Sequence, residues 1–177
     1  MTYKTKVINL FGGAGIGKST IAARLFSELK MQGREVELVP EYAKEMVWEN
    51  RQPILDEQLY VFAKQYRRIS RLIGKVEYVI TDSPVILGII YTSDDYFKNL
   101  EPLILEAHDS FDNINIMLDR TAEYNPHGRQ QTKEEAIIID QRLRTLLSDR
   151  DDLYHTVTVN GSAHDTILKR LWEIENV

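Results

Sequence analysis

The sequence predicts an α/β fold in which a parallel β-sheet is covered by helices on both faces. Short apolar strand segments alternate with helical segments along the chain, and this alternation is typical of parallel sheets. A glycine-rich stretch joins the first strand to the first helix. The 177 residues contain no repeat, low-complexity segment or Pro/Gly/Ser linker, so we expect a single domain over residues 1–177.

The first strand is the apolar segment KVINLF, residues 6–11. A helix is predicted at 17–32, because apolar residues recur there at helical spacing, and Gly33 ends it. The second strand is EVELVP, residues 35–40, and its proline cannot continue the sheet ladder.

Two helices are predicted next, a short one at 41–49 and a long one at 55–73. The long helix carries an apolar stripe at helical spacing. The stripe consists of Leu55, Leu59, Phe62, Tyr66, Ile69 and Ile73. The third strand is EYVITD, residues 77–82.

Helical segments at about 85–92 and 96–108 precede the fourth strand, INIML, at 114–118. Residues 120–131 are polar and include a proline and a glycine, so we expect a loop. The remaining elements are a helix at 132–148, a strand at 156–161 and a closing helix at 163–175. Ligands of such sheets bind beyond the carboxyl ends of the strands.

The composition is that of an ordinary globular domain, with 43% apolar and 28% charged residues. No apolar run approaches the roughly 20 residues that span a bilayer, and the first residues lack the features of a signal peptide. We therefore expect a cytoplasmic protein that does not bind membranes. The absence of cysteine excludes disulfides, Cys–zinc sites and thiol nucleophiles. The net charge of −5 gives no global attraction to nucleic acid.

The glycine-rich stretch from Gly12 to Ser19 matches GxxxxGK[ST] in full. Glycines let backbone N–H groups turn inward around phosphate oxygens, and the following helix adds its positive N-terminal end. In this motif the lysine meets the outer phosphates and the serine hydroxyl binds Mg²⁺. The sequence therefore predicts a site for a nucleoside triphosphate with Mg²⁺. The residues predicted to form it are Gly13, Ala14, Gly15, Ile16, Gly17, Lys18, Ser19 and Thr20.

Acidic residues follow two of the predicted strands. Asp82 ends the third strand, where a P-loop needs a carboxylate for Mg²⁺; alternatively it begins a turn before Pro84. Ser83 is either a turn former or a substrate contact. Glu41 lies just past the second strand and could accept the proton of a hydroxyl that is being phosphorylated. Its position alone better fits the first turn of a helix, where acids favour the helix dipole.

The polar loop after the fourth strand carries Arg120 and Arg129. An arginine on such a loop can neutralise charge as a phosphoryl group moves, although each alone would be an ordinary surface charge. Thr132 and Glu135 have the spacing of a capping box, so we expect Glu135 to be structural. His127 is expected to be a surface residue.

Taken together, the P-loop, PEYAKE after the second strand, TDSP at the third and RTAEYNPHGRQQTKEEA after the fourth resemble small P-loop kinases. The nearest are nicotinamide-riboside-kinase-like proteins, a group that includes many phage-encoded ATP-binding proteins. A more distant similarity is to deoxynucleoside kinases. The resemblance covers most of the chain. It implies five strands in the order 2-3-1-4-5 and an arginine lid at about 120–133.

The resemblance also implies roles for particular residues. It implies that Glu41 is the general base or a substrate ligand, as a glutamate after the second strand is in deoxynucleoside kinases. Those kinases carry Glu-Arg-Ser at the third strand, where this chain has Thr-Asp-Ser, so we expect Arg120 or Arg129 to replace the missing arginine. Small residues after the fifth strand could let adenine lie against the backbone, and they equally fit a helix N-cap. These are Gly161, Ser162 and Ala163.

The acceptor side is predicted on the long helix. Gln58 and Gln65 share one side of it, and their amides could pair with a nucleobase or a nicotinamide; alternatively both are satisfied by backbone. Tyr42, within PEYAKE, is also predicted to contact substrate. A basic ridge lies opposite the apolar stripe and is either a solvated face or a track for phosphates. It consists of Lys64, Arg67, Arg68, Arg71 and Lys75.

These observations favour an ATP-dependent phosphotransferase that acts on a hydroxyl of a nucleoside-like or nucleotide-like acceptor. One alternative is a kinase that phosphorylates a modified, hydroxymethyl base within DNA, which the ridge favours and the net charge disfavours. Another is a regulatory ATPase that binds a partner without phosphorylating it. A GTP-driven switch is disfavoured, because no Asn/Thr-Lys-x-Asp stretch follows the fourth strand. The acceptor and the oligomeric state are left open.

Overall fold

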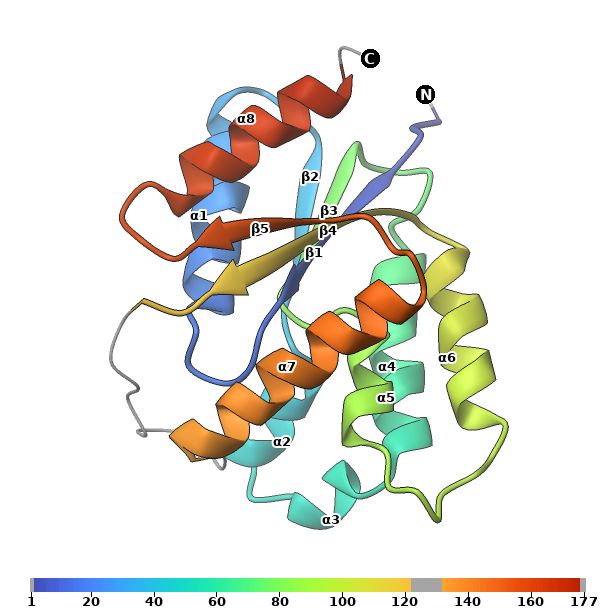
Figure 1. Cartoon of the computed structure of the whole chain (residues 1–177). Helices are drawn as coiled ribbons and strands as arrows, with labels where there is room; N and C mark the ends of the chain where they lie inside the picture. Colours follow the sequence, from blue (N-terminus) through green and yellow to red (C-terminus); the bar gives the residue numbers. More distant parts are fainter. Residues whose placement is uncertain (1, 122–131, 176–177) are drawn as a thin grey trace.

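A five-stranded, all-parallel sheet forms the centre of the computed structural model, which describes residues 2–121 and 132–175 (Figure 1). The strand order is β2-β3-β1-β4-β5, so the order that the kinase resemblance implied is confirmed. All five expected strands are present. They are β1 (Lys6–Phe11), β2 (Val36–Val39), β3 (Tyr78–Thr81), β4 (Asp112–Asp119) and β5 (Tyr154–Thr158).

Helices connect the strands and cover both faces of the sheet (Figure 1). In the described ranges they are α1 (Lys18–Met31), α2 (Tyr42–Trp48), α3 (Gln52–Leu55), α4 (Gln58–Ser70), α5 (Leu87–Tyr91), α6 (Leu100–Asp109), α7 (Lys133–Asp149) and α8 (Ala163–Glu175). The expected capping box opens α7, where the Glu135 N–H donates to Thr132 Oγ1 at 3.2 Å and the Thr132 N–H donates to Glu135 Oε2 at 2.7 Å.

The prediction of one long helix at 55–73 is wrong at both ends, because the observed helix α4 begins at Gln58 and ends at Ser70. The chain first forms the short α3, with Pro53 in its first turn, and then turns before α4 begins. Helix α4 ends at Ser70, and the turn that follows passes through Gly74, whose φ of 81° suits glycine. The apolar stripe continues across these breaks, although its last member, Ile73, is 38% exposed. In the turn after α4 it is the neighbouring Leu72 that packs against the core.

Side chains of β1 alternate between the two faces of the sheet. Ile8 and Leu10 pack in a core formed with α1 and α8, whereas Val7 and Phe11 pack in the core formed with α4, α5, α6 and α7. These four side chains are fully buried, and burial of such a side chain contributes about 2 kcal/mol to stability. This two-sided burial explains why the strand sequences are almost continuously apolar.

Because all strands run in the same direction, their carboxyl ends meet at one edge of the sheet. The P-loop, Glu41, Asp82, Arg120 and the β5–α8 connection all follow strand ends at this edge. The fold therefore gathers segments that lie far apart in the sequence. Within the described residues, no helix combines the length and apolar character needed to cross a membrane.

Candidate active site

The P-loop lies between β1 and α1 with the backbone conformation that its glycines permit. The φ angles of Gly12, Gly15 and Gly17 are 143°, 76° and 103°, values that residues with a side chain rarely adopt. Gly17 is the N-cap of α1 and cannot supply a side-chain cap, so the first amides of this helix are left for another acceptor. This arrangement suits an anion at the start of α1.

The residues predicted to bind the triphosphate divide into two groups. Gly13 and Ile16 are buried, and Ile16 packs in the core beneath α1. The others face the open space above the loop: Ala14, Gly15, Gly17, Lys18, Ser19 and Thr20 all line one cavity. The exposed wall of the loop is thus the part that could contact phosphate.

Lys18 folds back over the loop. Its Nζ donates hydrogen bonds to Gly12 O at 2.6 Å and to Gly13 O at 3.2 Å. Burial lowers the pKa of Lys18, and the carboxylates of Glu41 and Asp82 oppose this change. The ammonium group is therefore held beside the loop, close to two negative side chains.

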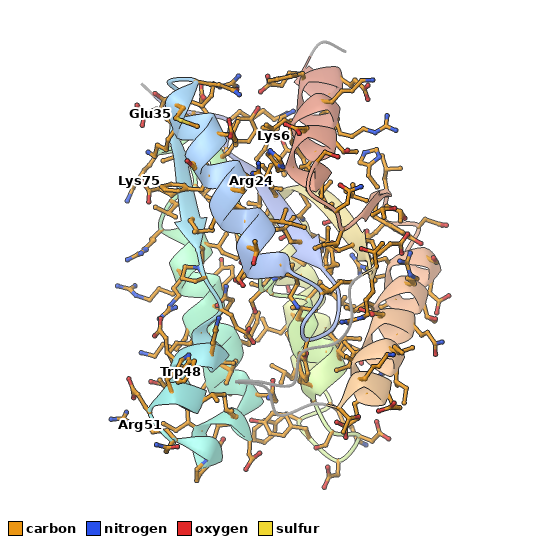
Figure 2. The ribbon with its side chains drawn as sticks, turned by 90° about the vertical axis from the view of Figure 1, so that its left-hand side faces the viewer. Lys6, Arg24, Glu35, Trp48, Arg51 and Lys75 are labelled. Carbon is orange, nitrogen blue, oxygen red and sulfur yellow. The ribbon has the colours of Figure 1, made fainter. Side chains whose placement is uncertain are left out.

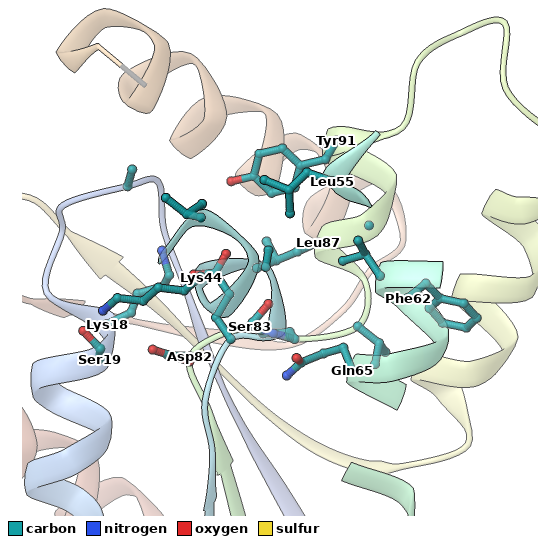
Figure 3. Close-up of a pocket in the computed structure, with 18 of the residues that line it drawn as sticks. Lys18, Ser19, Lys44, Leu55, Phe62, Gln65, Asp82, Ser83, Leu87 and Tyr91 are labelled. Carbon is teal, nitrogen blue, oxygen red and sulfur yellow. The ribbon is translucent and has the colours of Figure 1, made fainter. Parts of the chain in front are cut away.

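Asp82 is the carboxylate that the sequence assigned to Mg²⁺. The residue is 6% exposed, and its Oδ1 has no hydrogen-bond partner among residues 2–121 and 132–175. Burial raises the pKa of Asp82, while the charge of Lys18 lowers it. Figure 3 shows Ser19, at the start of α1, and Asp82 next to each other.

A buried carboxylate oxygen beside a P-loop hydroxyl fits a Mg²⁺ ion, because Mg²⁺ takes few protein ligands and completes its shell with water and substrate phosphates. The described residues contain no cluster of three or more His, Asp or Glu side chains that could hold a metal by themselves. The pair of Ser19 and Asp82 is therefore suited to a metal that arrives with a nucleotide.

Glu41 is half-buried and lines the same cavity. It is the N-cap of α2, yet within the described chain its carboxylate makes no capping hydrogen bond. Burial raises the pKa of Glu41, Lys18 lowers it, and the nearby Asp82 raises it further. In the described ranges, the Glu41 carboxylate forms no hydrogen bond to the helix that it begins, and it interacts electrostatically with Lys18 and Asp82. This position fits a role in the site better than a role as a helix cap.

The cavity between the P-loop and helices α2, α4 and α5 has a volume of about 490 Å³ (Figure 3). Its charged end lies at the P-loop, and its other end is mainly apolar. The charged residues that line it are Lys18, Glu41, Lys44 and Asp82. The apolar and aromatic residues include Val47, Trp48, Leu55, Val61, Phe62, Leu87 and Tyr91. Cavities of this size and composition bind small organic ligands.

Two cavity residues were missed in the sequence. The Lys44 side chain extends from α2 toward Lys18 (Figure 3), and its charge lowers the pKa of both Glu41 and Asp82. Tyr91 is 42% exposed and lines the cavity. Partial burial and the nearby carboxylates raise the pKa of Tyr91, so its hydroxyl stays protonated and can donate a hydrogen bond to a ligand. Lys44 is the fifth letter of the PEYAKE segment, and its place three residues after Glu41 was the available signal.

Gln58 and Gln65 both line the cavity, but their side-chain amides form hydrogen bonds with other groups of the protein. Gln58 Nε2 donates to Leu55 O at 2.6 Å. Gln65 Oε1 accepts from the Tyr42 N–H at 3.1 Å, and its Nε2 donates to Thr81 Oγ1 at 3.2 Å. The alternative interpretation, in which backbone groups satisfy both glutamines, describes the bonds of Gln58 and of Gln65 Oε1, whereas the partner of Gln65 Nε2 is a side chain.

The other two predicted substrate contacts differ in position. Ser83 lines the cavity, and its N–H donates to Thr81 Oγ1 at 3.1 Å. Tyr42 is 7% exposed and lies between α2 and α4, where its ring meets the Tyr60 ring edge-on at 5.9 Å and the Arg68 guanidinium at 4.9 Å. Tyr42 thus packs behind the cavity wall instead of forming it.

Of the two arginines predicted to act in the site, only Arg120 belongs to the residues that the structure describes. Arg120 follows β4, and its Nη2 forms an ion pair with Asp140 Oδ2 of α7 at 3.2 Å. Arg129 and the rest of the expected lid between 122 and 131 lie outside the described residues, so the role of Arg129 stays a prediction.

The expected adenine segment lies at the start of α8. The Ser162 N–H and Oγ both donate to Asn160 Oδ1, at 2.9 and 3.0 Å, and Arg24 Nη1 donates to Gly161 O at 3.3 Å. Ser162 O accepts the Thr166 N–H at 3.1 Å, which makes Ser162 the N-cap. The segment adjoins the P-loop on the side of the loop that faces β5, apart from the cavity, and stays a prediction as an adenine site.

Part of the basic ridge is engaged within the protein. Arg68 pairs with both oxygens of Glu45, at 2.9 and 2.7 Å, and Lys64 Nζ lies 5.0 Å from the centroid of the Tyr60 ring. Figure 2 shows Lys75 toward one end of the molecule and Trp48, at the cavity, toward the other. The ridge therefore runs away from the cavity.

Comparison with known proteins identifies a family. A family model described as an AAA domain, which belongs to a P-loop family, matches residues 7–165. No curated protein matches the sequence.

Similar folds occur among solved structures. One is a NadR protein in complex with NR, at 20% identity and a TM-score of 0.76, and the match covers 98% of this chain and 52% of that one. Another is thymidylate kinase from Ehrlichia chaffeensis, at 17% identity and a TM-score of 0.63, covering 94% and 98%. A third is deoxyadenosine kinase from M. mycoides with bound dATP, at 16% identity and a TM-score of 0.58, covering 93% and 98%.

This chain thus spans about half the length of the NadR chain. At these identities the likeness concerns the fold, and it confirms the expected fold of small P-loop kinases.

Proposed function

Since this chain belongs to the P-loop family described as an AAA domain, we propose that it is a kinase that transfers the γ-phosphate of ATP to a hydroxyl of a nucleoside-like or nucleotide-like acceptor. One observation carries the proposal. Lys18, Glu41 and Asp82 converge at the charged end of a mainly apolar cavity that opens onto the P-loop. A nucleotide switch or a motor has no need of a cavity that extends from its phosphate site to an apolar end between helices.

The proposed reaction assigns one task to each residue. The acceptor hydroxyl attacks the γ-phosphorus, its proton passes to Glu41, and the bond from the γ-phosphorus to the bridging oxygen breaks to release ADP. Lys18 is positioned to neutralise charge on the transferred group. Ser19 and Asp82 would hold Mg²⁺, which supplies charge neutralisation on the phosphates when bound.

The position of Glu41 favours a hydroxyl acceptor. A carboxylate at the charged end of the cavity can accept the proton that a hydroxyl loses as it attacks phosphorus. The apolar far end fits a planar ring, and the neutral Tyr91 hydroxyl can orient it by a hydrogen bond. NadR was solved with NR, so nicotinamide riboside is among the first acceptors to test.

Lys44 supports the nucleotide-like alternative, because its side chain adds a second positive charge near Lys18. A hydroxymethyl base within DNA is less favoured, since the basic ridge runs away from the cavity. A regulatory ATPase that phosphorylates no acceptor is the remaining alternative, and the acceptor assay distinguishes it.

The test is an assay with Mg²⁺ and γ-labelled ATP against nucleosides, nucleotides, nicotinamide riboside and duplex DNA with hydroxymethyl bases. We expect label on a nucleoside-like hydroxyl. The variant Lys18→Ala should lose transfer while keeping its fold, and Lys30→Ala, on the exposed side of the same helix, should keep transfer. Full turnover by Lys18→Ala would contradict the proposal, and hydrolysis without labelled acceptor would favour the ATPase.

A further inference from the structure

Helix α7 packs against the P-loop, and its backbone contacts the backbone of the loop at Gly13. A Cβ atom added to Gly13 would lie 2.3 Å from Ala136 O, closer than any real contact. Only a glycine can therefore occupy this position while α7 stays where it is. The first turn of the P-loop and the backbone of α7 are in direct contact.

Asp140 lies one helical turn beyond Ala136, on the same face of α7. Its Oδ1 accepts a hydrogen bond from the Gly13 N–H. Its Oδ2 forms the ion pair with Arg120 Nη2 at 3.2 Å. One carboxylate thus joins three segments: the loop after β1, the residue after β4, and α7 itself.

The pair is shielded from solvent. The side chains of Arg120 and Asp140 are 13% and 16% exposed, and at this depth an arginine whose counter-charge is removed carries a substantial desolvation cost. The carboxylate therefore stabilises Arg120 at this place. In the described part of the chain, no α7 residue lines the acceptor cavity. Asp140 can therefore influence the reaction through the groups that it holds and through its negative charge, which opposes the effect of burial and raises the pKa of Lys18.

We propose that Asp140 is a positioning residue for phosphoryl transfer: it holds Arg120 beside the P-loop and fixes the first turn of the loop on α7. This inference rests on the proposed kinase function and on the expectation from the sequence that Arg120 neutralises charge on the transferred phosphate. Small displacements of such groups are costly, because a shift of about 1 Å in a catalytic group can lower the rate about 10²-fold.

A neighbouring ion pair provides a matched control. Arg144 lies one turn after Asp140 on α7 and pairs through Nη2 with Asp119 Oδ1, the last residue of β4. This pair links α7 to the end of β4, next to Arg120. Within the described residues, neither partner forms a hydrogen bond or an ion pair with the P-loop. The variant Arg144→Ala removes an ion pair between α7 and β4 and leaves the contacts of Gly13 unchanged.

The experiment compares Asp140→Ala, Asp140→Asn, Arg120→Ala and Arg144→Ala in the full chain. We expect Asp140→Ala to lower kcat about 10²-fold with little change in the KM of the acceptor. Asp140→Asn should lose less, because its amide oxygen can still accept from Gly13. The double variant Asp140→Ala with Arg120→Ala should be no slower than Arg120→Ala alone, since coupled groups are not additive.

A second readout is the affinity for ATP, measured by calorimetry on the same variants. Asp140→Ala should weaken ATP binding, because the first turn of the loop loses its anchor, and Arg144→Ala should not. If Asp140→Ala lowers only the melting temperature, as an ordinary ion pair would, and leaves kcat and ATP affinity unchanged, the proposal is overturned.

The two proposals fail in different ways. If wild-type protein binds ATP but phosphorylates no acceptor, the kinase proposal fails, and the ATP affinities of Asp140→Ala and Arg144→Ala still decide whether Asp140 anchors the loop. If Asp140→Ala does not fold, Asp140→Asn decides: equal kcat and ATP affinity in Asp140→Asn and Arg144→Ala would overturn the role of the carboxylate.

Discussion

The change Glu41→Gln separates a catalytic carboxylate from a helix cap. If Glu41 accepts the proton of the acceptor hydroxyl, the amide should lower kcat by about 10²- to 10⁴-fold, which corresponds to about 2.7 to 5.4 kcal/mol in activation free energy. ATP binding should be retained. We expect this loss because the amide has the size of the carboxylate but cannot take up a proton.

The same change should raise the melting temperature. Burial raises the pKa of Glu41 in the folded protein, so the folded state holds this proton more tightly than the unfolded state does. The free energy of unfolding therefore falls as pH rises from the unfolded pKa through the folded one. At neutral pH the ionised Glu41 destabilises the fold, and the neutral amide removes that cost.

Glu45 is the matched control on the same helix. The hydrogen-bonded Arg68 lowers the pKa of Glu45, so its ionised form stabilises the fold above its unfolded pKa, and this contribution is lost as pH falls through the folded pKa. Glu45→Gln should lower the free energy of unfolding by about 1 kcal/mol or less, as expected for an exposed pair, with a slightly lower melting temperature and an unchanged kcat.

The assay is kcat and KM for both variants from pH 5 to 9, with thermal unfolding at each pH. For the wild type, kcat/KM should fall toward low pH with a midpoint above the ordinary 4.5. A Glu41→Gln variant with unchanged kcat and a lowered melting temperature would refute the reasoning and restore the helix-dipole role.

Three further changes test the rest of the site. Asp82→Asn should raise the Mg²⁺ concentration needed for half-maximal activity while ATP still binds, and an unchanged Mg²⁺ titration would contradict the metal role. Gly13→Ala should lower both activity and melting temperature, because its Cβ would meet backbone of α7 at 2.3 Å; a melting temperature equal to that of the wild type would exclude this close contact. Arg67→Glu with Arg71→Glu should leave transfer to small acceptors unchanged and stability within about 0.5 kcal/mol, whereas a selective loss on duplex DNA would favour a DNA acceptor.

Much of the fold was predictable because it depends on local patterns. The five strands follow from short apolar runs, and the P-loop follows from a motif whose glycine conformations are local. The division of the expected long helix into α3 and α4 was missed. Apolar periodicity does not show where a helix ends, because apolar residues can recur at helical spacing across a turn. Ile73 continues the stripe beyond the end of α4, although it is 38% exposed.

The polar residues of the site were predictable only in part. Glu41, Asp82 and Arg120 follow strand ends, and the parallel topology brings strand ends together. Gln65 was expected at the acceptor, but its amide links the Tyr42 N–H to Thr81 Oγ1. Those partners belong to α2 and β3, and no spacing rule along α4 could have shown that they would lie within reach.

Asp140 illustrates what a motif leaves out. The pattern GxxxxGK[ST] permits any residue at position 13, and the sequence around Asp140 is an ordinary amphipathic helix. The roles of Gly13 and Asp140 can be recognised only when the two residues are seen in the fold. Helix α7 lies so close to the P-loop that a side chain at position 13 would collide with its backbone. The same closeness lets the Asp140 carboxylate accept a hydrogen bond from the Gly13 N–H. A glycine at a permissive position of a motif can therefore indicate that another element packs against the loop, and that element is where further positioning residues should be sought.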